Sequence, residues 1–160
     1  MPHIISIVGR SQSGKTTLIE KLIPELKKRG YRIGTIKHAH HGFDIDKSGK
    51  DSWRHRHAGA DTIIVASQGK IAMVKNDDCE SLDCLQDYFE DLDLIITEGY
   101  KRENKPKIEV LRAARHAELI CKADQNLIAV VTDVDINPNV PKFGLEDIKE
   151  LADLIEETFL

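Results

Sequence analysis

Residues 4–16 read I-I-S-I-V-G-R-S-Q-S-G-K-T, an apolar run followed by a polar loop between two glycines. Its second part matches the phosphate-loop pattern Gly-x-x-x-x-Gly-Lys-Ser/Thr at every fixed position, which are Gly9, Gly14, Lys15 and Thr16. Glycines let such a loop curl so that successive backbone N–H groups point at phosphate oxygens, and the following helix adds its positive N-terminal end. The stretch therefore predicts a buried strand, a phosphate-binding loop and a helix.

The residue types of the loop assign roles to its members. In this pattern the lysine, Lys15, reaches the β- and γ-phosphates of a nucleotide, and the hydroxyl of Thr16 is a Mg²⁺ ligand. We expect Lys15 to take part in catalysis as well as binding. The nucleotide contacts are predicted for the whole loop and the next turn: Gly9, Arg10, Ser11, Gln12, Ser13, Gly14, Lys15, Thr16 and Thr17.

The remaining chain alternates apolar runs with helical periods. Runs at 4–8, 62–66, 94–97 and 127–132 are β-branched and do not alternate with polar residues, as in strands buried on both faces of a parallel sheet. We predict an α/β fold, a P-loop NTPase-like sandwich with a mostly parallel central sheet flanked by helices. A small hairpin is expected where 70–74 pairs with 62–66, and the length of 160 residues predicts one nucleotide-binding domain over 1–160.

Charged residues follow two of the predicted strands. Glu98 comes directly after 94–97, where a carboxylate can hold Mg²⁺ through water or orient a nucleophile, so we predict a catalytic and metal-binding role for it. Lys37 ends the predicted strand 31–37, and Lys101 follows Glu98 by three residues. Either lysine could neutralise phosphate charge, while the alternative is a solvated charge at a strand end.

The loop at 38–46 reads H-A-H-H-G-F-D-I-D and permits three interpretations. It could be a metal site built from its histidines and aspartates, a switch loop that meets the γ-phosphate and Mg²⁺, or a polar loop with incidental histidines. Because Mg²⁺ prefers oxygen ligands, Asp44 or Asp46 is favoured over the histidines, and Asp44 is the candidate metal ligand.

The recognition of the base is not marked by the usual guanine-reading motif. Asn-Lys-x-Asp is absent, but Thr132 and Asp133 follow the buried run at 127–131. A carboxylate there could accept hydrogen bonds from guanine N1–H and N2–H₂, whereas in adenine it would face an acceptor. We therefore count Thr132 and Asp133 among the candidate nucleotide-binding residues, together with Lys37.

Composition narrows the class of protein. The net charge of −4 disfavours a globally basic nucleic-acid binder, yet residues 1–60 hold 12 Lys or Arg against 5 Asp or Glu. That basic portion suggests a locally held anion, or simply lysines on a helix surface. The three cysteines form no Cys-x-x-Cys pair, and no apolar run is long enough for a signal peptide or a membrane span. We expect a cytoplasmic protein with no nucleic-acid or membrane partner.

Four segments together resemble the molybdopterin-guanine dinucleotide biosynthesis protein B (MobB) family. They are GRSQSGKTTL at 9–18, TIKHAHHGFDIDKSGKDSWRHRHAGA at 35–60, LIITEGYK at 94–101 and AVVTD at 129–133. The first is common to many NTPases, whereas the second and third are far more specific. The resemblance covers nearly the whole chain.

The resemblance implies a P-loop GTPase-like fold and a GTP- and Mg²⁺-binding homodimer with weak GTPase activity. Such proteins work beside the guanylyltransferase MobA in molybdenum-cofactor biosynthesis, as an accessory or adapter. The resemblance makes molybdopterin itself a second candidate partner. By the same resemblance, residues 9–17 would bind the triphosphate, Thr16 the Mg²⁺, and Glu98 stands where the family's strand-end acid stands.

Three other functions remain open from the residues. A small-molecule kinase would use the same loop with an acceptor pocket and fast transfer. A nickel or zinc metallochaperone GTPase would carry its metal on His38, His40 and His41. A pure scaffold would use the nucleotide only to set its shape.

Overall fold

In the computed structural model the chain is described over residues 1–39, 41–114 and 118–160. It divides into two compact units, one formed by Met1–His38 with Ser81–Leu160 and the other by Ala39–Glu80. The phosphate loop belongs to the first unit. The single nucleotide-binding domain over 1–160 stays a prediction.

The first unit is built on a six-stranded sheet in which each pair of neighbours is parallel. The strands, in their order across the sheet, are β2 (Ile33–Lys37), β5 (Leu94–Glu98), β1 (His3–Val8), β6 (Lys107–Leu111), β7 (Leu127–Thr132) and β8 (Lys142–Phe143). The apolar runs of β1, β5 and β7 are buried almost throughout, as strands covered on both faces require. With the antiparallel hairpin of the second unit, this confirms the predicted fold class.

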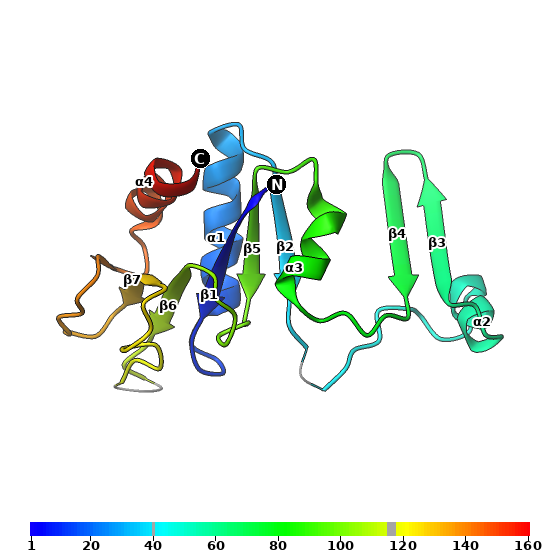
Figure 1. Ribbon diagram of the computed structural model, residues 1–160, viewed down its shortest axis with the longest axis horizontal. Helices are drawn as coiled ribbons and strands as arrows, with labels where there is room; N and C mark the ends of the chain where they lie inside the picture. The colour runs from blue at the N-terminus through cyan, green and yellow to red at the C-terminus, as the bar shows by residue number, and fades with distance from the viewer. Residues whose placement is uncertain (40, 115–117) are drawn as a thin grey trace. The chain divides into compact units, whose positions relative to one another are not determined.

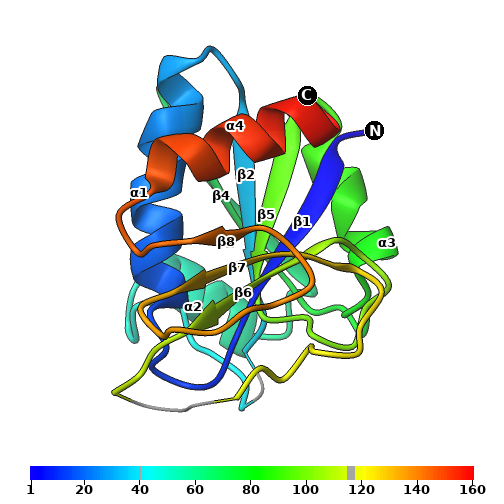
Figure 2. The same ribbon diagram turned by 90° about the vertical axis from the view of Figure 1, so that its left-hand side faces the viewer.

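Helices cover the two faces of this sheet unequally. The helices α1 (Lys15–Lys28) and α4 (Ile148–Phe159) pack together in the main core, where Leu22 and Ile155 are fully buried (Figures 1 and 2). On the other face, Leu82 packs with Ile4 and Ile95. Leu82 begins the short helix α3 (Leu82–Leu85), which continues as the 3-10 helix η1 (Gln86–Phe89).

The parallel strands give the first unit two different ends. Both chain termini lie at the amino end of β1, where the ring centroids of His3 and Phe159 are 5.9 Å apart (Figures 1 and 2). The phosphate loop lies at the opposite end, where β1 stops and α1 begins. In open parallel sheets the carboxyl ends of the strands form the usual ligand-binding edge.

Two charged side chains of β6 are buried and tie down the connection to β7. Lys107 is 1% exposed, and its Nζ donates to the Glu103 carbonyl (2.6 Å) and pairs with Asp124 Oδ2 (2.9 Å). Glu109 is also 1% exposed, and its two carboxylate oxygens accept hydrogen bonds from the backbone N–H groups of Ile120 (2.7 Å) and Cys121 (2.9 Å). The described residues of this connection form no helix or strand. The contacts of Lys107 and Glu109 therefore hold the connection against the sheet, as the packing of a helix would otherwise do.

The same environment changes the acidity of two groups in that connection. The backbone N–H of Asn126, followed by the ammonium of Lys107, lowers the pKa of Asp124. Burial raises the pKa of the Cys121 thiol to about 11, with Glu109 and Asp124 adding to the effect. Cys121 is therefore a neutral apolar side chain at physiological pH rather than a reactive thiolate.

The second unit contains the helix α2 (Asp51–His57) and an antiparallel hairpin of β3 (Thr62–Ser67) and β4 (Lys70–Lys75). The predicted hairpin is thereby confirmed, but the expectation that 62–66 is buried on both faces is wrong, because Ile64 and Val65 are exposed in this two-stranded sheet. In its register Ile64 pairs with Met73 and Ala66 with Ile71, so these four side chains share one face. Ile71 is 73% exposed and Ile64 61% exposed, which leaves this face without a core of its own.

Glu109 allows a direct test of how the connection is held. Replacing Glu109 with Ala leaves the Ile120 and Cys121 N–H groups buried without acceptors, and we expect a loss of about 3 kcal/mol in the free energy of unfolding. Urea denaturation measures the change. Glu157→Ala, an exposed glutamate near the end of α4, is the control and should change stability by less than about 0.5 kcal/mol. Equal unfolding midpoints for the two variants would contradict the anchoring role.

Candidate functional site

The loop between β1 and α1 has the backbone of an anion-binding nest. Gly9, Gln12 and Gly14 have positive φ angles of 146°, 59° and 96°. Gly14 is the N-cap residue of α1, and no side chain caps the helix there. The first N–H groups of α1 are thus left to a ligand or water, as the sequence motif predicts.

The start of this loop is tightly packed. A Cβ atom on Gly9 would lie 2.6 Å from the Val110 carbonyl oxygen and 2.7 Å from Ser13 Oγ. Ser13 is buried, and its hydroxyl has no hydrogen-bond partner among the residues that the structure describes. A buried hydroxyl without a partner, inside a loop of inward-curled backbone, is consistent with a site that a bound anion completes.

Most other predicted loop residues face solvent. Arg10, Ser11 and Gln12 are exposed in the loop, and Thr17 is exposed in the first turn of α1. Their predicted contacts with a nucleotide stay predictions.

Lys15 folds back across the loop. Its Nζ donates to the carbonyls of Arg10 (2.8 Å) and Gly9 (3.2 Å). Burial lowers the pKa of Lys15 and Lys37 lowers it further, while Glu98 acts in the opposite direction. An ammonium that is partly desolvated and held by neutral carbonyls would gain from an added anion, so its surroundings suit the phosphate-binding role.

Three of the predicted site residues meet at the carboxyl ends of the strands. The hydroxyl of Thr16 donates to Glu98 Oε2 (2.9 Å), and Lys37 Nζ lies 3.5 Å from Glu98 Oε1. The meeting of Lys37 and Glu98 follows from the sheet, because the two residues are directly paired in the register of β2 and β5. Lys15 also interacts electrostatically with both Lys37 and Glu98. The sequence predicted these residues separately, and the fold brings them together.

The donors at Thr16 and Glu98 fit a magnesium ion. A hydroxyl and a carboxylate are hard oxygen ligands, and both lie beside the loop that would hold phosphate oxygens. Mg²⁺ usually keeps several waters and binds few protein groups directly, so this small set is sufficient. When bound, the ion would neutralise phosphate charge.

The predicted base-reading pair lies at the end of β7. Thr132 Oγ1 accepts a hydrogen bond from the Val134 N–H (2.9 Å). The Asp133 carboxylate faces the residues that follow β6: Oδ1 accepts from the Ala113 N–H (2.8 Å), and Oδ2 lies 3.7 Å from Arg112 Nε. The role of these residues in reading a base stays a prediction.

Arg112 is a residue that the sequence analysis missed. Its Cδ lies 3.6 Å from the position that a Cβ on Gly14 would take, so it borders the phosphate loop. The available signal was its place directly after the apolar strand at 107–111, by the same rule that selected Glu98.

The predicted metal ligand Asp44 belongs to the second unit. There its Oδ1 accepts hydrogen bonds from Arg56 Nη2 (3.0 Å) and from the Asp46 backbone N–H (3.2 Å), while Asp46 Oδ1 accepts from the Ser52 hydroxyl (2.9 Å). The role of Asp44 as a Mg²⁺ ligand stays a prediction.

The role of the three histidines proposed for a carried metal stays a prediction. His40 lies outside the described residues, and the His38 ring stacks on Tyr100 with a centroid distance of 4.8 Å. Over 1–39, 41–114 and 118–160, no group of three or more His, Cys, Asp or Glu side chains is placed to hold a metal ion.

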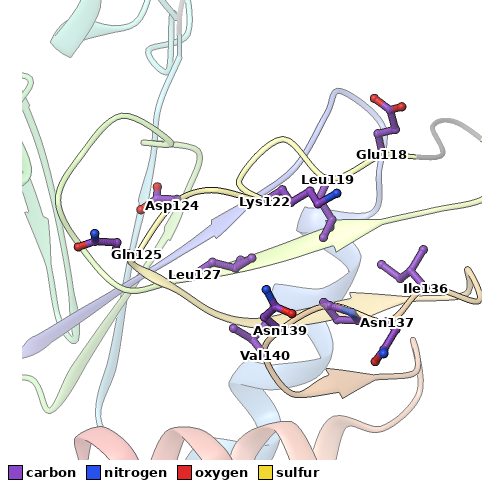
Figure 3. A pocket seen from close by; sticks show the side chains of 11 residues that line it. Glu118, Leu119, Lys122, Asp124, Gln125, Leu127, Ile136, Asn137, Asn139 and Val140 are labelled. Atoms are coloured by element: carbon purple, nitrogen blue, oxygen red, sulfur yellow. The ribbon is translucent and has the colours of Figure 1, made fainter.

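A separate pocket of about 640 Å³ opens on the first unit (Figure 3). It lies between the chain before β7 and the chain before β8, with Leu119, Leu127, Ile136 and Val140 among its apolar lining residues and Asn137 and Asn139 among its polar ones. None of the predicted site residues lines it. The helices of the described part of the chain are all too short or too polar to cross a bilayer.

The tight packing at Gly9 gives a test that compares two glycines. Gly9 and Gly30 both have positive φ, but a Cβ on Gly30 would meet no atom within 4 Å. We expect Gly30→Ala to cost about 1 kcal/mol through its backbone alone, and Gly9→Ala to cost about 3 kcal/mol or more, since Val110 is a backbone neighbour that cannot yield. Urea midpoints measure both, and equal losses would contradict the close approach at Gly9.

Comparison with known proteins identifies the family of this chain. The family model for molybdopterin guanine dinucleotide synthesis protein B matches residues 4–133. The chain is 43% identical to the molybdopterin-guanine dinucleotide biosynthesis adapter protein of Escherichia coli (strain K12), over 98% of this chain and 93% of that protein. It is 39% identical to the adapter protein of Haemophilus influenzae, over 96% and 87% of the two chains.

Solved structures that superpose on this chain belong to the same family as these relatives. A crystal structure of molybdopterin-guanine biosynthesis protein B superposes with a TM-score of 0.77 at 30% identity, covering 96% of this chain and 98% of that one. The crystal structure of Bacillus subtilis MobB superposes with a TM-score of 0.78 at 26% identity, covering 100% and 99%. The chain therefore belongs to the molybdopterin-guanine dinucleotide synthesis protein B (MobB) family.

Proposed function

We propose that this protein is a GTP-binding adapter in the biosynthesis of molybdopterin guanine dinucleotide, with weak GTPase activity and with the guanylyltransferase MobA as its partner. The adapter role is the one named for relatives that match nearly the whole chain. The GTP and Mg²⁺ site is supported by one observation above all: Lys15, Thr16 and Glu98 converge beside a phosphate loop at the carboxyl ends of the strands.

Each of these residues has a defined task in the proposed site. The loop N–H groups and Lys15 bind the triphosphate, Thr16 holds the Mg²⁺ ion, and Glu98 orients the Thr16 hydroxyl and the water around the metal. Lys37, paired with Glu98, adds positive charge near the terminal phosphate.

The surroundings of Glu98 support the proposal of slow hydrolysis. One of its oxygens accepts from Thr16 and the other pairs with Lys37. A carboxylate engaged on both oxygens is a poor base for an attacking water, so hydrolysis would need a group or a rearrangement supplied by a partner. A bound nucleotide that is hydrolysed only slowly suits an adapter better than it suits an enzyme with rapid turnover.

The exposed hairpin supports an assembly of two copies. Ile64, Ala66, Ile71 and Met73 make one apolar face of β3 and β4, and a two-stranded sheet has two unpaired edges. An exposed apolar face of this kind is typical of an interaction surface. We propose that it forms the homodimer in the cytoplasm, with MobA and molybdopterin as further partners and with no nucleic acid or membrane involved.

Nucleotide binding is tested by calorimetry with Mg²⁺ present. We expect wild type to bind GTP more tightly than ATP, and Lys15→Ala to lose both, because it removes the cation that meets the phosphates. Removal of Mg²⁺ with a chelator should weaken GTP binding to wild type. Lys27→Ala, an exposed lysine in the last turn of α1, is the matched control and should bind as wild type does.

Two results would count against the GTP proposal. One is an absence of GTP binding by wild type with Mg²⁺ present. The other is ATP binding that equals or exceeds GTP binding, above all with turnover that rises sharply on addition of one metabolite, which would indicate a kinase.

The homodimer is tested by light scattering coupled to size exclusion. We expect Ile71→Lys with Met73→Lys to shift the protein from dimer to monomer, because two desolvated ammonium groups at an apolar interface cost several kcal/mol. Leu160→Lys, which changes an exposed apolar residue of the other unit, should leave the dimer intact. A monomeric wild type, or a dimer that survives the double change, would overturn the proposed interface.

A further inference from the structure

Arg112 places a second cation against the phosphate loop. It follows β6 directly, and its Cδ and Nη1 atoms lie 3.6 and 3.8 Å from the position of a Cβ on Gly14. Gly14 is the N-cap of α1, so the guanidinium lies beside the residue at which that helix begins. A Cβ at Gly14 would be in ordinary van der Waals contact with the stem of Arg112, so the two residues are direct neighbours.

The guanidinium of Arg112 has a buried hydrogen-bond donor, Nε–H, that lacks an acceptor among the described residues. The nearest carboxylate oxygen, Asp133 Oδ2, is 3.7 Å from Nε. The side chain is 43% exposed, so part of the guanidinium is reachable from solvent. A buried donor without an acceptor costs free energy unless a further group completes it.

Asp133 is turned toward Arg112 and its neighbour. Oδ1 accepts from the Ala113 N–H (2.8 Å) while Oδ2 faces Arg112. The sheet explains the arrangement, because Leu111 and Thr132 are paired in the register of β6 and β7 and the next residues leave the sheet side by side. Both oxygens of Asp133 are therefore directed at the segment that carries Arg112.

We propose that Arg112 binds the phosphate chain of the nucleotide, and that Asp133 is a positioning residue that holds Arg112 beside Gly14. The inference rests on the proposed nucleotide-binding function and assigns two residues of that site. A guanidinium offers a planar set of donors that matches phosphate oxygens, which a lysine cannot reproduce. With Lys15 across the loop, the phosphates would meet a cation from each side of the helix terminus.

The test measures the binding of three probes with Mg²⁺ by calorimetry: GTP, ATP and inorganic triphosphate. We expect Arg112→Gln to weaken all three by the same factor, roughly tenfold to hundredfold, as for the loss of a charge-assisted hydrogen bond. Arg112→Lys should recover only part of the loss. Arg32→Gln is the control, because Arg32 forms a similar exposed pair with Asp93 (3.6 Å) at the amino end of β2, and it should bind as wild type does.

Asp133→Asn and the double variant Arg112→Gln with Asp133→Asn test the positioning role. We expect Asp133→Asn to change the affinity for all three probes by one common factor, to leave the ratio of GTP to ATP affinity unchanged, and to have no effect in the Arg112→Gln background. A loss of the GTP preference in Asp133→Asn would overturn this role and assign Asp133 to the base.

Folded variants distinguish the role of Arg112 from the binding of nucleotide itself. If wild type binds GTP and Lys15→Ala abolishes binding while folded Arg112→Gln binds like wild type, the role of Arg112 is overturned and the nucleotide site stands. If wild type binds none of the three probes, the proposed function fails and the inference fails with it. A urea midpoint for each variant identifies any loss of folding.

Discussion

The contact between Gly9 and the backbone of Val110 is the constraint on which the site depends. The chain leaves β1 with only 2.6 Å between a notional Cβ and the Val110 carbonyl oxygen, so a side chain is excluded at this point. Because of this close contact, the loop begins directly against the backbone of β6. As a result α1 begins close to the ends of β5 and β6, and Thr16 reaches Glu98 while Gly14 lies beside Arg112.

The parallel register of the sheet then supplies the remaining groups. Strands that run the same way bring their carboxyl ends to one edge, so residues far apart in the chain become neighbours there. Lys37 and Glu98 are one such pair, and the residues after Leu111 and Thr132 are another. The candidate site is thus assembled from charged side chains at the ends of β2, β5, β6 and β7, around the start of α1.

Much of this could be predicted from local patterns. The loop has a fixed spacing, and the buried strands have unbroken β-branched runs, so the fold class and the positions of Lys15, Thr16 and Glu98 followed from the sequence. The pairing of Arg112 with Asp133 could not be predicted in this way, because it depends on β6 and β7 being neighbours. The structure of the connection from β6 to β7 could not be predicted either. Glu109 accepts hydrogen bonds there from N–H groups that are eleven and twelve residues away along the chain. The two-residue strand β8 is too short to leave a periodic signal.

The hairpin of the second unit has a consequence for how that unit folds. Two strands with one apolar face open to water are at best marginally stable by themselves. Whatever surface covers Ile64, Ile71 and Met73 also supplies the hydrophobic burial that the hairpin lacks. With the proposed second copy on this face, folding of Ala39–Glu80 would be coupled to association, and its stability would depend on protein concentration by mass action. In an adapter built in this way, the second unit would be well ordered only when its partner is bound. Its functional conformation would therefore depend on that partner.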